Sequence, residues 1–393
     1  MTLTNAINEF FQLITKFQVP FFLVSISSAA IIILFFAMPV SGFATYLERK
    51  ISADFHERIG PNRVGPWGLL QLIVDGIKMF LKEDTVTKNA DRVVYNLAPS
   101  LVTLGSLGAF AVIPFSAYII GANLNIGIFW AMALGSVVSL GVLLGAWSSD
   151  NKWSLLGGMR GAAQIISYEI PLGLSVLSVV VVSGTLNMHE LVATQAWPTL
   201  GGKGHFWNIF HNPFLFINFF VYFIAALAEC NRTPFDLPEA ESELVSGFNT
   251  EFSGMRFGLY ALAEFADVIL FACISSSIFL GGWQLPFVDL SLLHFGMSLG
   301  GKSLDPVFQT ALMMGVFLAK ASVIVFVVMW LRWTLPRLRV DQLMNMCWKY
   351  LIPISFVCVV GAAIWVWFFE AILGWPSSSM VHIVGRMLGV YSS

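Results

Sequence analysis

The sequence has few charged residues: Lys, Arg, Asp and Glu make up only 11% of its 393 residues. Ordinary soluble domains carry about 25%. Because a water-soluble chain of this length needs charged groups to cover its core, this scarcity excludes a soluble enzyme. The net charge is −2, so the chain also lacks the basic character expected of a protein that binds nucleic acid.

The sequence also lacks the residue spacings that hold metals. The six histidines show no metal-ligand spacing, and none pairs with another across facing segments as two haem ligands would. The four cysteines contain no CxxC pair: Cys230, Cys273, Cys347 and Cys358. These absences argue against a zinc site, an iron–sulfur cluster and a disulfide framework, so we expect the chain to bind no redox metal itself.

Long apolar segments are abundant, since 57% of the residues are hydrophobic. Several runs approach the ~20 residues that a helix needs to cross a bilayer. The pattern predicts an all-α integral membrane protein, with about eight membrane-spanning helices in a single polytopic domain over residues 1–393. The expected spans lie near residues 20–45, 97–120, 126–147, 162–184, 213–229, 257–281, 307–332 and 350–373.

Lys and Arg are distributed unevenly between alternate connections. Of the 21, 16 lie in the connections 46–96, 148–160, 230–256 and 332–349; four lie in the other connections and tails, and Lys320 lies within a span. Cytoplasmic loops carry the excess of basic residues. The distribution therefore predicts that these four connections face the cytoplasm, or the mitochondrial matrix, and that both termini lie on the other side.

The 46–96 connection has a helical pattern of its own from Pro66 to Glu83. Its polar residues recur at spacings of four, three and four, which draws one polar stripe on an apolar helix. At about 1.5 Å per residue the helix is about 25 Å long, too short and too polar for a span. We expect an amphipathic interfacial helix, either a lipid anchor or the wall of a portal. The apolar candidates for that wall are Trp67, Leu70, Val74, Ile77 and Phe80.

Four carboxylates lie within the spans or at their inner ends. Glu264 and Asp267 are one helical turn apart and share a face, and Glu169 and Glu229 belong to two other spans. A buried ionised carboxylate costs several kcal/mol unless it is paired, hydrated or protonated. We therefore expect these residues to face a polar cavity and to carry protons. For Lys320, we expect a buried acid as its partner.

The 230–256 connection is rich in acidic residues. Asp236 followed by Glu239 has the spacing of a helix capping box, which leaves a structural role open for this pair. Capping does not account for Glu241, Glu243 and Glu251. These three form either a solvated acidic surface or part of a hydrated acidic path.

Several separate motifs closely resemble one membrane subunit of respiratory complex I, the proton-pumping NADH:quinone oxidoreductase. This subunit is designated H in bacteria and 1 in mitochondria. The resemblance runs from about residue 20 to 373, and the acidic loop is its most specific part. The motifs are ERK at 48–50, RIGPNRVGP at 58–66, KMFLKE at 78–83, ECNRTPFD at 229–236, EAESELVSG at 239–247 and PRLRVDQ at 336–342.

The resemblance implies a cofactor-free membrane subunit of an H+-translocating enzyme, without a complete active site of its own. Such a chain forms the membrane side and lipid entrance of a quinone chamber. FMN and the iron–sulfur clusters would belong to soluble partner subunits on the inner face, beside further membrane-arm subunits. Quinone would be the substrate. The location would be a bacterial inner membrane, or alternatively the mitochondrial inner membrane.

The resemblance also implies residue roles. Quinone-cavity or docking positions would be Arg49, Arg58, Asp75, Arg232 and Arg337. The acidic route would include Glu169, Glu229, Asp236, Glu239, Glu241, Glu243, Glu251 and Glu264. Asp267 and Lys320 lie within the spans, and we add both to this route for that reason.

Some features depart from the family. Phe265 stands where the family commonly has Tyr, so any hydroxyl role there is lost or moved. The loops 185–212 and 283–306 and the tail after Trp375 are long beside the mitochondrial form, which favours a bacterial chain.

Two other functions remain open at this point. A membrane anchor of a related hydrogenase complex would share much of the acidic loop without using quinone. A stand-alone proton-coupled transporter would explain the buried acids, but it would not explain four charged inner loops without an internal repeat.

Overall fold

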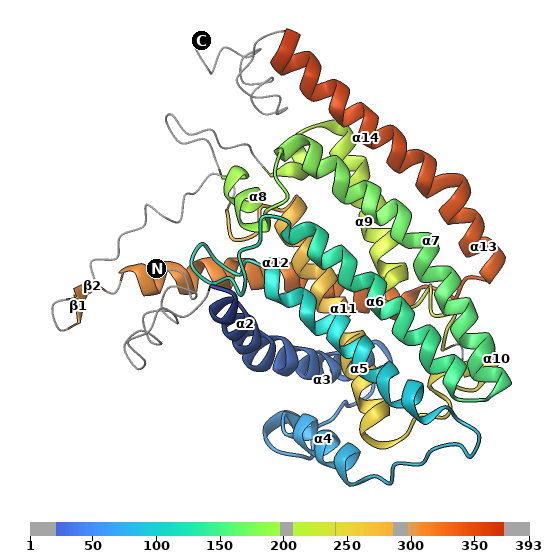
Figure 1. The fold of residues 1–393 in the computed structure, drawn as a ribbon. Coiled ribbons are helices and arrows are strands. Elements are labelled where there is room, and N and C mark those ends of the chain that lie inside the picture. The colour runs from blue at the N-terminus through green and yellow to red at the C-terminus, as the bar shows by residue number, and fades with distance from the viewer. Residues whose placement is uncertain are drawn as a thin grey trace.

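The computed structural model describes residues 21–196, 207–239, 241–285, 298–299, 302–303 and 305–372. The regular secondary structure of these residues is almost entirely helical (Figure 1). The strands β1 (Ser298–Leu299) and β2 (Lys302–Ser303) form one short antiparallel pair. The prediction of an all-α membrane protein is confirmed.

Among the described residues, seven helical segments are long and apolar enough to cross a membrane, and α9 (Pro213–Glu229) is a shorter apolar helix of 17 residues. The segments are built from α2 (Phe21–Ile32) with α3 (Met38–Phe55), α5 (Arg92–Gly108), α6 (Gly127–Ser148), α7 (Lys152–Ser183), α11 (Gly254–Phe279), α12 (Asp305–Thr334), and α13 (Val340–Asn345) with α14 (Ile352–Val366). The short helices are α4 (Gln71–Leu81), α8 (Met188–Thr194) and α10 (Glu241–Leu244).

Some helices extend beyond the apolar runs at their charged ends. The first segment continues to Phe55, the segment of α7 begins at Lys152, and the last begins at Val340. Backbone hydrogen bonding continues a helix past its apolar residues. Hydropathy alone therefore ends the first span too early and begins the other two too late. The second segment ends at Val112, because the chain then turns and Pro114 pairs with Ile120.

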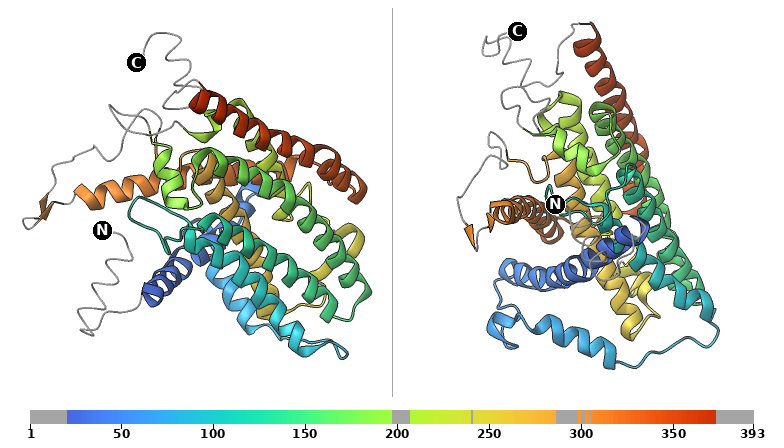
Figure 2. Two further views of the ribbon diagram at one scale, coloured as in Figure 1. Left: turned by 45° about the horizontal axis from the view of Figure 1, so that its top comes forward. Right: turned by 60° about the vertical axis from the view of Figure 1, so that its left-hand side comes forward.

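The interfacial helix is shorter than the predicted range of 66–83. α4 begins at Gln71, after a short 3-10 turn over Pro66–Gly68. Gly65, Trp67 and Gly68 have φ of +72°, +54° and +81°, so the chain cannot be α-helical through these positions. None of the residues of α4 is buried. Figure 1 and the right-hand view of Figure 2 show α4 outside the bundle, beside α3.

α11 lies at the centre of the bundle and packs against α3, α5, α9 and α12. α5, α6 and α7 are successive neighbours, and α7 also packs against α9 and α14 (Figures 1 and 2). In Figure 1, α12 runs steeply across these helices. Polar side chains carried by α11 can therefore meet those of most other segments.

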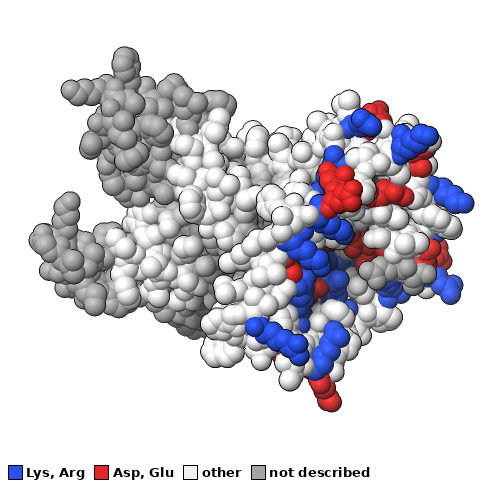
Figure 3. Space-filling model, turned by 90° about the horizontal axis from the view of Figure 1, so that it is seen from below, with Lys and Arg blue, Asp and Glu red and all other residues white. Residues whose placement is uncertain are grey.

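The charged side chains gather at one end of the molecule. On the face drawn in Figure 3, Lys, Arg, Asp and Glu crowd one end, and the remaining described surface is almost free of them. This separation agrees with the predicted grouping of the charged connections on one side of a membrane.

Candidate functional site

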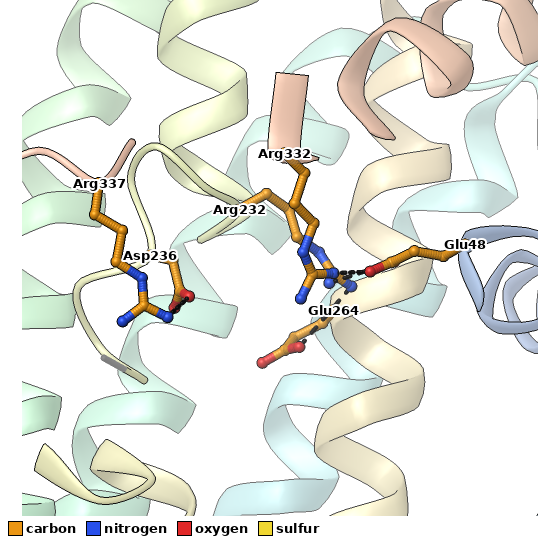
Figure 4. Close-up of polar contacts among 6 residues, drawn as sticks. All are labelled: Glu48, Arg232, Asp236, Glu264, Arg332 and Arg337. Carbon is orange, nitrogen blue, oxygen red and sulfur yellow. Dashed lines mark hydrogen bonds and ion pairs between the residues drawn. The ribbon is translucent and has the colours of Figure 1, made fainter. Parts of the chain in front are cut away.

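A cluster of ion pairs lies where α3, α11, α12 and the loop after α9 meet (Figure 4). We call it the ion-pair cluster. It contains three carboxylates and three guanidinium groups: Glu48, Asp236, Glu264, Arg232, Arg332 and Arg337.

Glu48 of α3 holds two arginines. One of its oxygens accepts a hydrogen bond from Arg332, near the end of α12, and its other oxygen lies 3.6 Å from Nη1 of Arg232. Glu48 and Arg232 are only 8% and 6% exposed. Buried charges need partners of opposite sign. The three side chains therefore join α3, α12 and the loop after α9 into one unit.

Arg232 extends the cluster to α11. Its Nη2 lies 4.0 Å from an oxygen of Glu264, and its guanidinium lies over the Phe265 ring, 4.3 Å from the ring centroid. Phe265 thus contacts the arginine through its ring face, which needs no hydroxyl.

Asp236 is buried at the edge of the cluster and accepts a hydrogen bond of 2.8 Å from Arg337. Burial, together with the negative charge of Glu239, raises the pKa of Asp236 to about 6, and Arg337 opposes both effects. The capping-box interpretation is wrong: α10 begins only at Glu241, and Glu239 instead accepts a hydrogen bond from Asn249.

A second group of acids surrounds a cavity inside the bundle, which we call the carboxylate cavity. Glu229 of α9 and Asp267 of α11 line this space of about 50 Å³ between α5, α6, α9 and α11. A cavity of this size has room for water. Gly135 of α6 also lines it, and a Cβ there would lie 2.7 Å from a Glu229 oxygen. The next residue, Ser136, donates a hydrogen bond to Glu169 of α7.

Two candidate acids lie apart from both groups. Glu243 is exposed and pairs with Arg160 at 2.7 Å. Glu251 accepts a hydrogen bond from Asn151 at 2.5 Å and borders an open groove at the charged end. The side chain of Glu241 lies outside the described residues.

The candidate quinone-cavity residues near α4 mostly contact one another. Arg49 pairs with Asp75 at 2.5 Å, which joins α3 to α4, and Arg58 is exposed on the loop after α3. The Tyr46 hydroxyl donates to the Trp67 carbonyl oxygen at 2.7 Å. The expected wall residues of α4 and the turn before it are exposed: Trp67, Leu70, Val74, Ile77 and Phe80.

An apolar groove of about 320 Å³ lies between α3, α11 and α12. Its lining includes Phe43, Leu47, Cys273 and Met329, and it contains none of the α4 residues expected to line a portal. This apolar hollow beside the first span is therefore lined by α3, α11 and α12 and not by α4.

Among the described residues, the partners of Lys320 are backbone carbonyls and not the acid that we expected. Its ammonium group donates hydrogen bonds to three backbone carbonyl oxygens at the end of α11. One carbonyl belongs to Leu280, the C-cap residue of α11, where the helix dipole adds negative charge, and the other two belong to the turn that follows.

Sequence reasoning left Glu48 and Arg332 out of the candidate residues. The predicted first span ended at residue 45, which placed Glu48 in a loop, whereas α3 continues to Phe55. The ERK motif was the available signal. Among the described residues, no group of three or more His, Cys, Asp or Glu side chains could hold a metal ion.

Comparisons with known proteins agree on one family. The family model described as NADH dehydrogenase matches residues 27–363. The chain is 45% identical to the NADH-quinone oxidoreductase subunit designated H of Anaeromyxobacter dehalogenans, covering 88% of this chain and 83% of the relative. It is 46% identical to the corresponding protein of Chlorobaculum parvum (86% and 91% covered) and 43% identical to that of Chlorobaculum tepidum (93% and 99% covered).

Proposed function

Since the chain belongs to the NADH dehydrogenase family that includes the H-designated subunits of NADH-quinone oxidoreductase, and is thus a membrane subunit of that enzyme complex, we propose how its polar groups serve the reaction. The ion-pair cluster forms the membrane side of the quinone chamber. The carboxylate cavity continues from it as the acidic route that couples quinone reduction to proton translocation.

One observation carries this proposal: a single turn of α11 joins the two groups. Glu264 lies beside Arg232 in the ion-pair cluster, and Asp267, three residues later, lines the carboxylate cavity with Glu229. Residues three apart on a helix are neighbours on one face. A change of charge at Arg232 therefore reaches the cavity through adjacent carboxyl groups.

The coupling step is electrostatic. Negative charge developing on the quinone competes with Glu48 and Glu264 for Arg232. A carboxylate that loses its cation binds a proton more readily, because the ionised form is then uncompensated in a buried site. The proton affinities of Asp267 and Glu229 change in turn, and neighbouring membrane subunits respond by moving protons.

The remaining assignments follow from the same proposal. Arg49, Arg58 and Asp75 border the quinone entrance between α3 and α4, and Arg337 helps to dock the soluble subunits. This chain binds neither FMN nor an iron–sulfur cluster, which belong to its partners. The charged end faces the cytoplasm of a bacterium, with both termini on the outside. The names of the relatives support this function over a hydrogenase anchor or a stand-alone transporter.

The test replaces Glu264 or Glu229 by Gln in the assembled complex. We expect quinone reduction and the proton-to-electron ratio to fall while the amount of assembled complex stays near wild type. Asp84→Asn, which affects only an exposed ion pair with Arg256, is the matched control and should retain activity. Unchanged turnover and an unchanged proton-to-electron ratio in both variants would refute the acidic route.

A further inference from the structure

Lys320 of α12 reaches the end of α11, where its ammonium group is surrounded by backbone oxygens. The three acceptors lie 2.7, 2.9 and 2.5 Å from Nζ and are the carbonyls of Leu280, Gly282 and Gln284. An ammonium group has three hydrogen-bond donors, so this set uses all of them. The Trp207 ring lies beside the same group, with its centroid 4.3 Å from Nζ.

The chain beyond α11 is shaped to bring these carbonyls together. α11 ends at Phe279, and Gly281 and Gly282 follow with φ of +73° and +52°, a conformation that favours glycine. A Cβ on Gly281 would lie 2.5 Å from the Trp207 ring. The turn therefore folds tightly under the indole, and its carbonyls converge on one point.

A positive charge on Lys320 is favourable at the place where these carbonyl oxygens converge. Leu280 is the C-cap residue of α11, so its carbonyl lies at the negative end of the helix dipole, which a cation stabilises. The carbonyls of Gly282 and Gln284 belong to the turn that follows. The indole face adds an attraction for the same cation. Among the described residues, the hydrogen-bond acceptors of Lys320 are all backbone carbonyls.

α12 is thus attached at two places. Lys320 binds the end of α11, and Arg332, twelve residues or about 18 Å further along the helix, binds Glu48 of α3. Because α11 carries Glu264 and Asp267, its position along its own axis decides how these two side chains meet the ion-pair cluster and the carboxylate cavity.

We propose that Lys320 is a positioning residue: a fixed cation that clamps the end of α11 to α12 and so holds the two carboxyl groups of α11 in register. Its effect on turnover rests on the proposed function. The clamp itself is independent of that function, because it is a contact of α12 with the turn that follows α11, whereas Glu264 and Asp267 lie near the middle of that helix.

The test is chemical rescue in the purified complex. Lys320→Ala leaves the three carbonyls in place and a space that matches propylammonium, which reproduces the missing side chain beyond Cβ. We expect Lys320→Ala to lower the temperature of thermal inactivation and to reduce quinone reduction at least fivefold. Propylammonium should restore at least half of both, and 1-propanol, which lacks the charge, should restore neither.

Lys320→Met is the matched control. Its side chain fills the space without a charge, so we expect the same losses but no rescue by propylammonium. The assay uses detergent-solubilised complex, because amines dissipate a pH gradient across closed membranes. Wild type with propylammonium should be unaffected.

The outcomes separate the clamp from the acidic route. Wild-type behaviour of Lys320→Ala, or equal rescue by propanol, would overturn the clamp. A rescued loss of thermal stability with unchanged turnover would overturn the positioning role. The Glu264→Gln and Glu229→Gln results depend on none of these measurements, so they test the proposed function separately.

Discussion

The guanidinium of Arg232 lies over the ring of Phe265, while two carboxylates, Glu48 and Glu264, lie 3.6 and 4.0 Å from its nitrogens. The arginine is held by charge on its edges and by an aromatic face beneath it. The contact uses the ring of Phe265 rather than a hydroxyl group, so Phe is sufficient at this position.

Substitution of Phe265 tests this contact. Phe265→Tyr keeps the ring face and should leave the rate of quinone reduction near wild type. Phe265→Leu removes an attraction of about 1 kcal/mol, which corresponds to about a fivefold loss of rate if Arg232 is held by the ring. Steady-state assays of membranes with equal amounts of complex measure both. Equal rates for the Leu and Tyr variants would show that the ring does not position the arginine.

The pair formed by Glu48 and Arg332 suits a double-mutant comparison. Glu48→Leu leaves Arg332 without its carboxylate, and Arg332→Leu leaves Glu48 with Arg232 alone, 3.6 Å away. Removing one member of a buried ion pair typically costs about 3–5 kcal/mol. The double variant keeps the cluster neutral, with Arg232 still beside Glu264. We therefore expect each single variant to lower the temperature of thermal inactivation more than the double variant does.

Arg160→Leu is the control for that comparison, because it breaks only the exposed pair with Glu243, which contributes about 1 kcal/mol or less. If the losses of the two single variants simply add in the double variant, Glu48 and Arg332 do not interact energetically.

The sequence predicted some of these relationships and not others, for physical reasons. The three-residue spacing of Glu264 and Asp267 specifies neighbouring positions on any helix, so their shared face was predictable. The pairing of Glu48 with Arg332 was not, because it joins residues 284 positions apart and depends on how steeply α12 crosses the bundle. No local spacing encodes such a crossing.

Lys320 shows a different limit. A charge within an apolar run signals a buried partner, and side chains are the only partners that a sequence displays. The groups that bind Lys320 are backbone carbonyls, which every residue has. They become a cation site only when a helix ends and its turn converges on one point. The glycine pair at 281–282 was the local signal for such a turn.

The raised pKa of Asp236 predicts a specific dependence of stability on pH. Its pKa is about 6 in the folded protein against an ordinary value of 3.8, so the folded state binds this proton more tightly than the unfolded state does. The resulting stabilisation is complete below about pH 4 and is lost as the pH rises through about 6. The ion pair with Arg337 forms over the same range.

Asp236→Asn removes this titration and keeps an oxygen acceptor for Arg337. Relative to the Asn variant, the wild-type complex should therefore lose thermal stability between about pH 4 and 6 and change little above about pH 7. Inactivation temperatures measured across this range give the difference directly. A constant difference between the two proteins would contradict the assigned pKa.

Gly135 offers the sharpest test of the carboxylate cavity. A Cβ at this position would lie 2.7 Å from a carboxylate oxygen of Glu229, closer than real Cβ atoms approach other atoms, so Gly135→Ala must shift the carboxylate within the cavity. If Glu229 carries protons there, quinone-linked proton translocation should fall about tenfold or more, because a displacement of about 1 Å at a working group can cost about 100-fold.

Gly173→Ala is the matched control for Gly135→Ala: it is also a helical glycine of the bundle, and its added Cβ would meet only the end of Met132 at 3.9 Å. Alanine has a higher helix propensity than glycine, so neither substitution should destabilise its own helix. Proton uptake and quinone reduction, measured in vesicles with equal amounts of complex, separate the two substitutions. Full activity in Gly135→Ala would mean that Glu229 can leave its place beside α6 without consequence, and the cavity would then have no part in moving protons.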